Sequence, residues 1–385
     1  MQKRIFARAL SLALVLLLLM PGGVALAANA PMPGDLAGAK AAVLMEQVGG
    51  QSVASYQAEE KMEVGGLSRL PALLVVCEAM DAGILEPSAS ITVSEEAARI
   101  KGPTAFLSAY EVIDAASLMK AAVMITAGDA IYALSEAAYG SATACIQHMQ
   151  TRLFELGVDA VYADLMGAEV RLSANELACL GRALMNSPAF TAYSNLFFDG
   201  ISHADGRTTE LASANKLLKT SVGCTGVATG SSATAGYCGV FSVSRGGTAW
   251  LCTVIGAPNA SARFAAAGDL IDYGFAAYEV KNLARVEEVL VDAMPVLGAR
   301  RSTVALIAGK EAVLLMPRGT GHEAQWDLPE ALTAPLSSSE SVGTVRYLDD
   351  TGAEICSVEL FPAEDIPQAG VVDYAVIVLS GWVHG

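Results

Sequence analysis

The spacing of apolar residues changes twice along the chain, from strand-like to helical and back. Between residues 69 and 195 apolar residues recur at helical spacing in five segments that end near Gly or Ser: 72–83, 116–125, 130–140, 144–157 and 173–187. Strand-like runs come before them, at 40–56 around Gly49-Gly50, and after them, at 225–257. A closing helix is predicted at 262–280. The predicted order is strands, helical insert, strands and helix.

From about residue 280 the helical pattern stops, and short alternating runs are separated by turns such as Asp350-Thr351-Gly352. A chain of 385 residues has room for two domains. We therefore predict a first domain at 28–278 and a small β domain at 279–371. The apolar tail, 372–385, is too short to cross a bilayer.

The N-terminal block has the features of an export signal. Lys3, Arg4 and Arg8 precede an apolar run that ends near Met20, and Ala25-Leu26-Ala27 offers small residues for cleavage. The alternative is a retained anchor, but the run is shorter than the roughly 20 residues that a bilayer requires. We predict a signal peptide at 1–27, cleaved near Ala27, and an extracytoplasmic protein of the cell envelope.

Charge and cysteine usage exclude several classes of partner. The formal net charge is −16, and it becomes −19 without residues 1–27, which carry three positive and no negative charges. Nucleic acid is therefore not an expected partner, and membrane anchoring is doubtful. Seven cysteines without a CxxC pair and four scattered histidines predict neither a metal site nor a histidine-based triad, and no cofactor is expected. Cys77, Cys145 and Cys252 lie in apolar stretches and are predicted to be buried.

Several segments together resemble the serine-type D-alanyl-D-alanine carboxypeptidases, the low-molecular-mass penicillin-binding proteins that trim peptidoglycan stem peptides. The resemblance lies in the order and spacing of CEAMDAG, the block at 102–141, ASANKLL, the block at 228–247, LIDYGFAAYE and the block at 331–355. It implies an α+β penicilloyl-serine-transferase domain, with an antiparallel sheet flanked by helices and a helical subdomain, followed by a small β-sandwich-like domain.

The family's three catalytic motifs, SxxK, SxN and KTG, are all altered in this chain. Matching CEAMDAG to the family places the nucleophile at Gly66 and the motif lysine at Arg69. In the second motif Thr126 stands for the serine and Gly128 for the asparagine. In the third motif Ala228, Thr229 and Gly230 stand for Lys-Thr-Gly, so that this lysine is missing too.

These replacements remove the chemistry that the resemblance implies. Gly66 has no side chain that attacks a carbonyl, and a guanidinium such as that of Arg69 stays protonated at any working pH. Ser68 is a poor substitute, because the residue three positions on is Pro71. We predict instead that Ser68 caps the following helix and that Pro71 lies in its first turn.

The remaining motif positions predict a residual binding groove. Thr126 keeps a hydroxyl, Gly128 lacks the amide that the family uses to hold the peptide, and Ala228 removes a cation that would attract the substrate's carboxylate. Thr229 and Gly230 still favour a ligand next to the strand, and backbone N–H groups near 66 and 232 are expected to persist as an empty oxyanion hole. Asp129 and Glu136, seven residues apart, are interpreted as a charge near a helix cap and a solvated face.

Three functions are compatible with this sequence. The first is a catalytically silent, exported member of the family that binds peptidoglycan peptide or a wall-synthesis partner. The second is an active carboxypeptidase with relocated groups, with Ser68, Thr126 or Ser231 attacking and Lys101 or Lys216 as the base. The third is a scaffold whose C-terminal β domain binds a protein partner.

Overall fold

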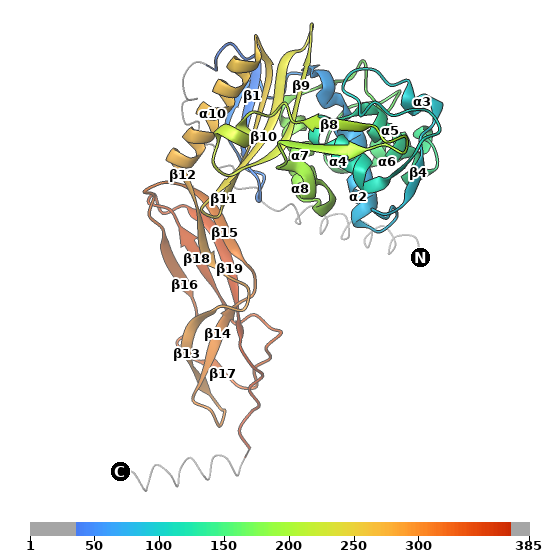
Figure 1. Ribbon diagram of the computed structural model, residues 1–385. Helices are drawn as coiled ribbons and strands as arrows, with labels where there is room; N and C mark the ends of the chain where they lie inside the picture. Colours follow the sequence, from blue (N-terminus) through green and yellow to red (C-terminus); the bar gives the residue numbers. More distant parts are fainter. Residues whose placement is uncertain (1–35, 371–385) are drawn as a thin grey trace, which may run out of the picture. The chain divides into compact units, whose positions relative to one another are not determined.

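The computed structural model describes residues 36–370 (Figure 1). The predicted signal peptide, 1–27, and the apolar tail, 372–385, lie outside the described residues. The described chain forms two units, one of residues 36–288 and 310–320 and the other of residues 289–309 and 321–370. The domain bounds expected from the sequence, 28–278 and 279–371, stay a prediction. Within 36–370 no helix combines the length and the apolar character needed to cross a membrane.

A five-stranded antiparallel sheet is the centre of the first unit. Its strands, in spatial order, are β2 (Ser52–Tyr56), β1 (Ala41–Glu46), β11 (Thr248–Ala257), β10 (Gly236–Arg245) and β9 (Cys224–Ser232). β1 is buried along its whole length, and β10 and β11 along most of theirs, as expected for central strands covered on both faces. The predicted hairpins at 40–56 and 225–257 are therefore confirmed.

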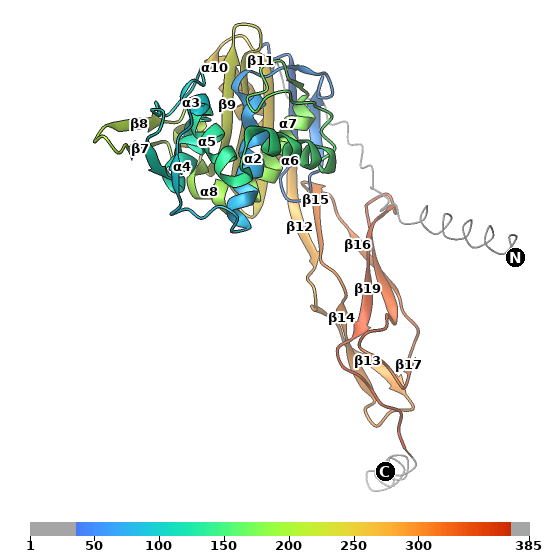
Figure 2. The ribbon, with the colours of Figure 1, turned by 90° about the vertical axis from the view of Figure 1, so that its right-hand side faces the viewer.

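Helices cover both faces of this sheet (Figures 1 and 2). α10 (Ala260–Ala277) packs on one face, and α7 (Ala174–Met185) packs on the other. The helical insert lies next to α7 and comprises η1 (Gly65–Arg69, a 3-10 helix), α2 (Leu70–Asp81), α3 (Glu95–Ala98), α4 (Ala115–Ile125), α5 (Gly128–Tyr139), α6 (Ala142–Glu155) and α8 (Pro188–Ser194). The helical segments predicted between 69 and 195 are thus confirmed.

Short paired strands complete the first unit. They are β3 (Met62–Glu63) with β6 (Arg171–Leu172), β4 (Ser90–Thr92) with β5 (Val112–Asp114), β7 (Phe198–Ser202) with β8 (Thr208–Ala212), and β12 (Tyr278–Ala284) with β15 (Ala312–Pro317). The short helix α9 (Leu217–Thr220) leads from β8 into β9.

The second unit contains a six-stranded sheet and, within its described residues, no helix. Its strands, in spatial order, are β16 (Glu323–Asp327), β18 (Gly343–Leu348), β19 (Glu354–Pro362), β14 (Thr303–Ala308), β13 (Val289–Leu297) and β17 (Leu332–Thr333). The loss of helical character that the sequence predicts beyond about residue 280 is confirmed.

Cysteines behave as the sequence predicts for small apolar residues. Cys77, Cys145 and Cys252 are completely buried. Burial raises the pKa of the Cys145 thiol to about 11, so this thiol is protonated and unreactive at neutral pH.

Close packing of α10 on the sheet depends on a glycine in the helix. A Cβ placed on Gly274 would lie 2.7 Å from Trp250 Cε2 and 2.8 Å from Leu44 Cδ2, whereas a Cβ on Gly268 of the same helix would meet nothing within 4 Å. Trp250 and Leu44 are fully buried, so neither side chain has space to move aside.

These two glycines provide a matched test of the packing. We expect Gly274→Ala to destabilise the fold by about 1–3 kcal/mol through overpacking. Gly268→Ala should stabilise it by about 0.5–1 kcal/mol, because alanine favours the helix. Urea unfolding of both variants measures the two effects, and equal effects would contradict the close contact of α10 with the sheet.

Candidate active site

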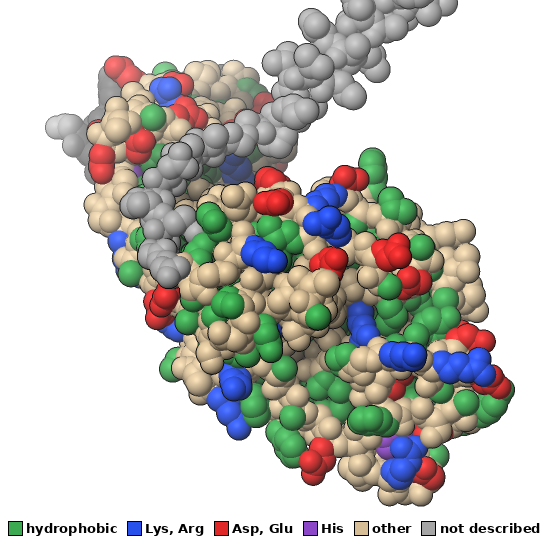
Figure 3. All heavy atoms as spheres, turned by 90° about the horizontal axis from the view of Figure 1, so that it is seen from above, with side chains coloured by type: hydrophobic (Ala, Val, Ile, Leu, Met, Phe, Trp, Pro, Cys, Tyr) green, Lys and Arg blue, Asp and Glu red, His purple; other side chains and the backbone are tan. Residues whose placement is uncertain are grey.

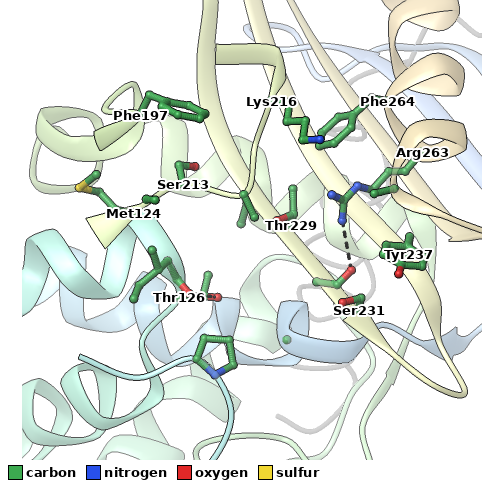
Figure 4. Close-up of a pocket in the computed structure, with 18 of the residues that line it drawn as sticks. Met124, Thr126, Phe197, Ser213, Lys216, Thr229, Ser231, Tyr237, Arg263 and Phe264 are labelled. Carbon is green, nitrogen blue, oxygen red and sulfur yellow. Dashed lines mark hydrogen bonds between the residues drawn. The ribbon is translucent and has the colours of Figure 1, made fainter. Parts of the chain in front are cut away.

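A pocket of about 530 Å³ contains five of the seven motif positions. Its lining includes Gly66, Thr126, Ala228, Thr229 and Gly230, which come from η1, the turn between α4 and α5, and β9 (Figure 4). The other two motif positions, Arg69 and Gly128, do not line the pocket. Within residues 36–370 no three His, Cys, Asp or Glu side chains gather in a way that holds a metal ion.

Two glycines allow η1 and β9 to approach each other at backbone distance. A Cβ on Gly65, whose φ is +57°, would lie 2.8 Å from the carbonyl carbon of Ser231. A Cβ on Gly230 would lie 2.8 Å from the amide nitrogen of Leu67. Such distances are shorter than any side chain tolerates, so the wall of the pocket here consists of main chain.

The space around Gly66 would accommodate a Cβ atom. A Cβ at this position would lie 3.9 Å from Thr126 Oγ1 and 4.0 Å from the Cα of Gly230, which are ordinary van der Waals distances. Packing therefore does not require glycine at position 66, which the sequence analysis predicts to correspond to the family's nucleophile.

Arg69 is buried, does not line the pocket, and donates hydrogen bonds to three main-chain carbonyl oxygens. Its Nη1 donates to the carbonyl oxygens of Thr126, at 2.9 Å, and Pro103, at 3.1 Å, and its Nη2 donates to that of Lys101, at 2.8 Å. Burial lowers the pKa of the guanidinium, while the nearby Asp129 carboxylate partly opposes this shift. A group that donates to three carbonyls in this way cannot accept a proton from a nucleophile.

The guanidinium of Arg69 also occupies the space of a side chain at position 128. A Cβ on Gly128 would lie 2.8 Å from Arg69 Nη1, 2.9 Å from Arg69 Cζ and 2.7 Å from Ile100 Cγ2. The replacements in the first and second motifs are therefore physically coupled, because the arginine and a residue larger than glycine compete for one volume.

Thr126 ends α4 in the left-handed conformation, with φ 50° and ψ 42°. Its hydroxyl donates to the carbonyl oxygen of Ile125 at 2.7 Å. A threonine in this conformation is strained, and the Arg69 hydrogen bond to its carbonyl helps to hold it there.

The interpretation of Asp129 from the sequence is wrong in one respect. The residue lies in the first turn of α5, as expected, but it is 2% exposed and accepts hydrogen bonds from the amides of Ala105 (2.8 Å), Leu107 (3.1 Å) and Ala130 (2.8 Å). Asp129 therefore fixes the loop 103–107 beside the pocket. Glu136, seven residues on, is only half-buried and accepts from the Ser94 hydroxyl at 2.7 Å.

The predicted cap at Ser68 is also wrong. Its hydroxyl donates to the carbonyl oxygen of Met166 at 2.6 Å, and the N-cap residue of α2 is Arg69, without a side-chain cap. The chain already turns as a 3-10 helix at Ser68, so the hydroxyl bonds to a distant loop. Pro71 lies in the first turn of α2, as predicted.

Arg263 lines the pocket and was not identified from the sequence. This residue of α10 is 4% exposed. Its Nη1 donates to the carbonyl oxygen of Cys238 at 3.0 Å and to that of Gly230 at 3.4 Å, and the dashed line in Figure 4 is the second of these bonds. Its Nε has no hydrogen-bond partner within the described chain, and no carboxylate there forms an ion pair with it. Burial lowers the pKa of this guanidinium to about 10, so it is still protonated at neutral pH.

A sequence signal for Arg263 exists in the helical pattern. Residues three, four and seven positions on, Ala266, Ala267 and Leu270, form the buried face of α10. A lone arginine in register with such a face is a buried cation, and a buried cation requires an anionic or polar partner.

The coupling between Arg69 and Gly128 predicts a non-additive pair. Gly128→Ala should cost about 1–3 kcal/mol of stability in the presence of Arg69 and less in an Arg69→Lys background, since Nη1 and Cζ are then absent. Gly66→Ala, where a Cβ fits, is the matched control and should change stability by less than about 0.5 kcal/mol. A double-mutant cycle followed by urea unfolding measures the coupling, and strictly additive costs would contradict it.

Comparisons with known proteins agree with this geometry. A sequence model of the D-alanyl-D-alanine carboxypeptidase family matches residues 27–259. The chain is 23% identical to D-alanyl-D-alanine carboxypeptidase DacF of Bacillus subtilis, over 89% of this chain and 90% of the relative. It is 26% identical to DacC of Escherichia coli, over 89% of each.

Solved structures show the same fold. Penicillin-binding protein 5 of Haemophilus influenzae superposes with a TM-score of 0.73 at 21% identity, over 87% of this chain and 99% of that one. A Streptococcus pneumoniae protein described as a peptidoglycan synthesis regulatory factor, PBP3, superposes with a TM-score of 0.67 at 22% identity, over 85% and 99%. The fold class predicted from the sequence is thereby confirmed, and the chain belongs to the D-alanyl-D-alanine carboxypeptidase family.

Proposed function

We propose that this chain is a catalytically silent, exported member of its family that binds the carboxylate end of peptidoglycan peptides. Arg69 carries this proposal. It stands at the family's lysine position, donates to three carbonyls, and leaves the pocket without an amine at the place where the family keeps its base. In addition, Gly66 has no side chain that could act as the nucleophile. Removing a nucleophile from such a catalytic unit lowers the rate by roughly 10⁶.

The geometry of the pocket supports binding rather than a purely structural role. Arg69 is buried and is not among the residues that line the pocket, so its side chain does not fill the cavity. Arg263 supplies a buried positive charge with an unpartnered Nε, and Thr229 and Ser231 line the same cavity. A carboxylate in the pocket would complement the charge of this cation, and the main-chain wall at Gly230 would let a peptide lie against β9.

The relocated-catalyst alternative has partial geometric support. Ser68 and Lys101 do not line the pocket, and the Ser68 hydroxyl is committed to Met166. Ser231 and Lys216 both line it, but no hydrogen bond joins their side chains in the described chain. The attack would require a contact that this arrangement lacks.

Penicillin labelling distinguishes the catalytically silent protein from a carboxypeptidase with relocated catalytic groups. We expect the purified protein to remain unmodified after incubation with a labelled penicillin, as measured by intact-protein mass spectrometry. Gly66→Ser alone should also remain unmodified, because Arg69 cannot act as the base. An adduct on the unaltered protein that disappears in Ser231→Ala or Thr126→Ala would favour the relocated catalyst and overturn the proposal.

Peptide binding tests the positive half of the proposal. An N-acetylated peptide ending in D-Ala-D-Ala should bind at least about tenfold more tightly than the same peptide with a C-terminal carboxamide, because charge-assisted hydrogen bonds contribute about 1.5–3 kcal/mol. Arg263→Met should abolish this difference. Calorimetry measures both affinities, and thermal unfolding verifies that the variant is folded. Equal binding of acid and amide would contradict the role of Arg263.

A further inference from the structure

The pocket has the opposite charge to the protein around it. The chain carries 40 Asp and Glu against 24 Lys and Arg, and acidic and basic side chains are interspersed over the face seen in Figure 3. The pocket lining nevertheless includes two cations, Lys216 and Arg263, and no Asp or Glu. In an acidic protein, such a reversal favours a ligand with more than one negative charge.

The two cations differ in their surroundings. Arg263 is buried and held by the carbonyl oxygens of Gly230 and Cys238, and its Cζ lies 4.5 Å from the ring centroid of Phe264. Lys216 is exposed, and its Nζ has no hydrogen-bond or ion-pair partner in the described chain. In Figure 4 its side chain points toward the side of the pocket on which Phe264 and Arg263 lie.

A third cation lies at the rim of the same cavity. The Nζ of Lys219 lies 3.9 Å from the centroid of the Phe197 ring, and Phe197 lines the pocket. Lys219 therefore adds to the positive potential there, although the aromatic face already attracts it. Of the two cations that line the pocket, Lys216 is the one whose charged group has no hydrogen-bond or ion-pair partner in the described chain.

We propose that the pocket selects peptides whose C-terminal residue carries a second acidic group. This inference rests on the proposed function, in which Arg263 binds the C-terminal carboxylate. Lys216 then binds the acidic side chain of the same residue, while the apolar lining, which includes Met124 and Phe197, contacts the body of the peptide. The ligand class is a diacidic peptide terminus rather than a terminal alanine alone.

An isosteric pair of peptides isolates the second charge. We compare N-acetyl-D-Ala-D-Glu with N-acetyl-D-Ala-D-Gln, which have the same shape, by calorimetry with the full chain. At low ionic strength the diacid should bind about fivefold more tightly, the upper range for an ion pair with an exposed lysine. In about 1 M salt, where the Debye length is about 3 Å, the preference should largely disappear.

Lys216→Gln should abolish the preference for D-Glu, while the D-Gln peptide still binds through its C-terminal carboxylate. Lys310→Gln is the matched control, because Lys310 is also exposed but does not line the pocket. It should keep the preference.

Equal affinities for the two peptides, or a preference that persists in Lys216→Gln, would overturn the inference. If the D-Ala-D-Ala and D-Gln peptides bind without any preference for D-Glu, this inference fails and the proposed function stands. If none of the peptides binds, both fail.

Discussion

The hydrogen bonds from the Arg69 guanidinium to three carbonyl oxygens determine how the rest of the site is arranged. They join η1 to the segment 101–103 and to the end of α4, three parts of the chain that are distant in sequence. A buried cation is tolerated only when it is solvated by the protein, and here main-chain oxygens do this, with Asp129 as the nearby opposite charge. The same bonds leave the guanidinium with no role in proton transfer.

The altered motif positions have different physical origins. Arg69 and Ile100 together leave no volume for a side chain at position 128. Gly102 has a similar relation to Arg69 Nη2, which lies 2.9 Å from its Cβ position. Gly66 is not forced by packing, since a side chain there meets only ordinary contacts. A serine restored at 66 would still face an arginine, and a lysine restored at 69 would still lack a nucleophile. In the proposed silent state, neither single substitution would supply both the nucleophile and the base.

The sequence predicts the framework well, because strand alternation and helical spacing are local properties. The hairpin at Ala41–Tyr56, the helices between 69 and 195 and the all-β second unit follow from such patterns. The misjudged side chains depend on distant partners. Ser68 bonds to Met166, 98 residues away, and Asp129 bonds to amides more than 20 residues away. No periodic pattern in the sequence predicts these contacts. They determine whether a polar residue caps a helix, faces solvent or holds a loop.

Binding and catalysis are separable in this fold because they rest on different parts of it. The catalytic groups of the family are side chains, and this chain is predicted to carry other residues at five of the motif positions, Gly66, Arg69, Thr126, Gly128 and Ala228. The pocket is built from the main-chain contact of η1 with β9 at Gly65 and Gly230, and from a buried arginine held by carbonyls of β9 and β10. These features also support the core of the sheet, so losing them would cost stability, whereas losing the nucleophile does not. A chain under selection only to fold would still have a reason to keep the main-chain wall. In the proposed function, the positive charge of Arg263, which forms no ion pair with a carboxylate of the described chain, is what favours a bound carboxylate at the pocket.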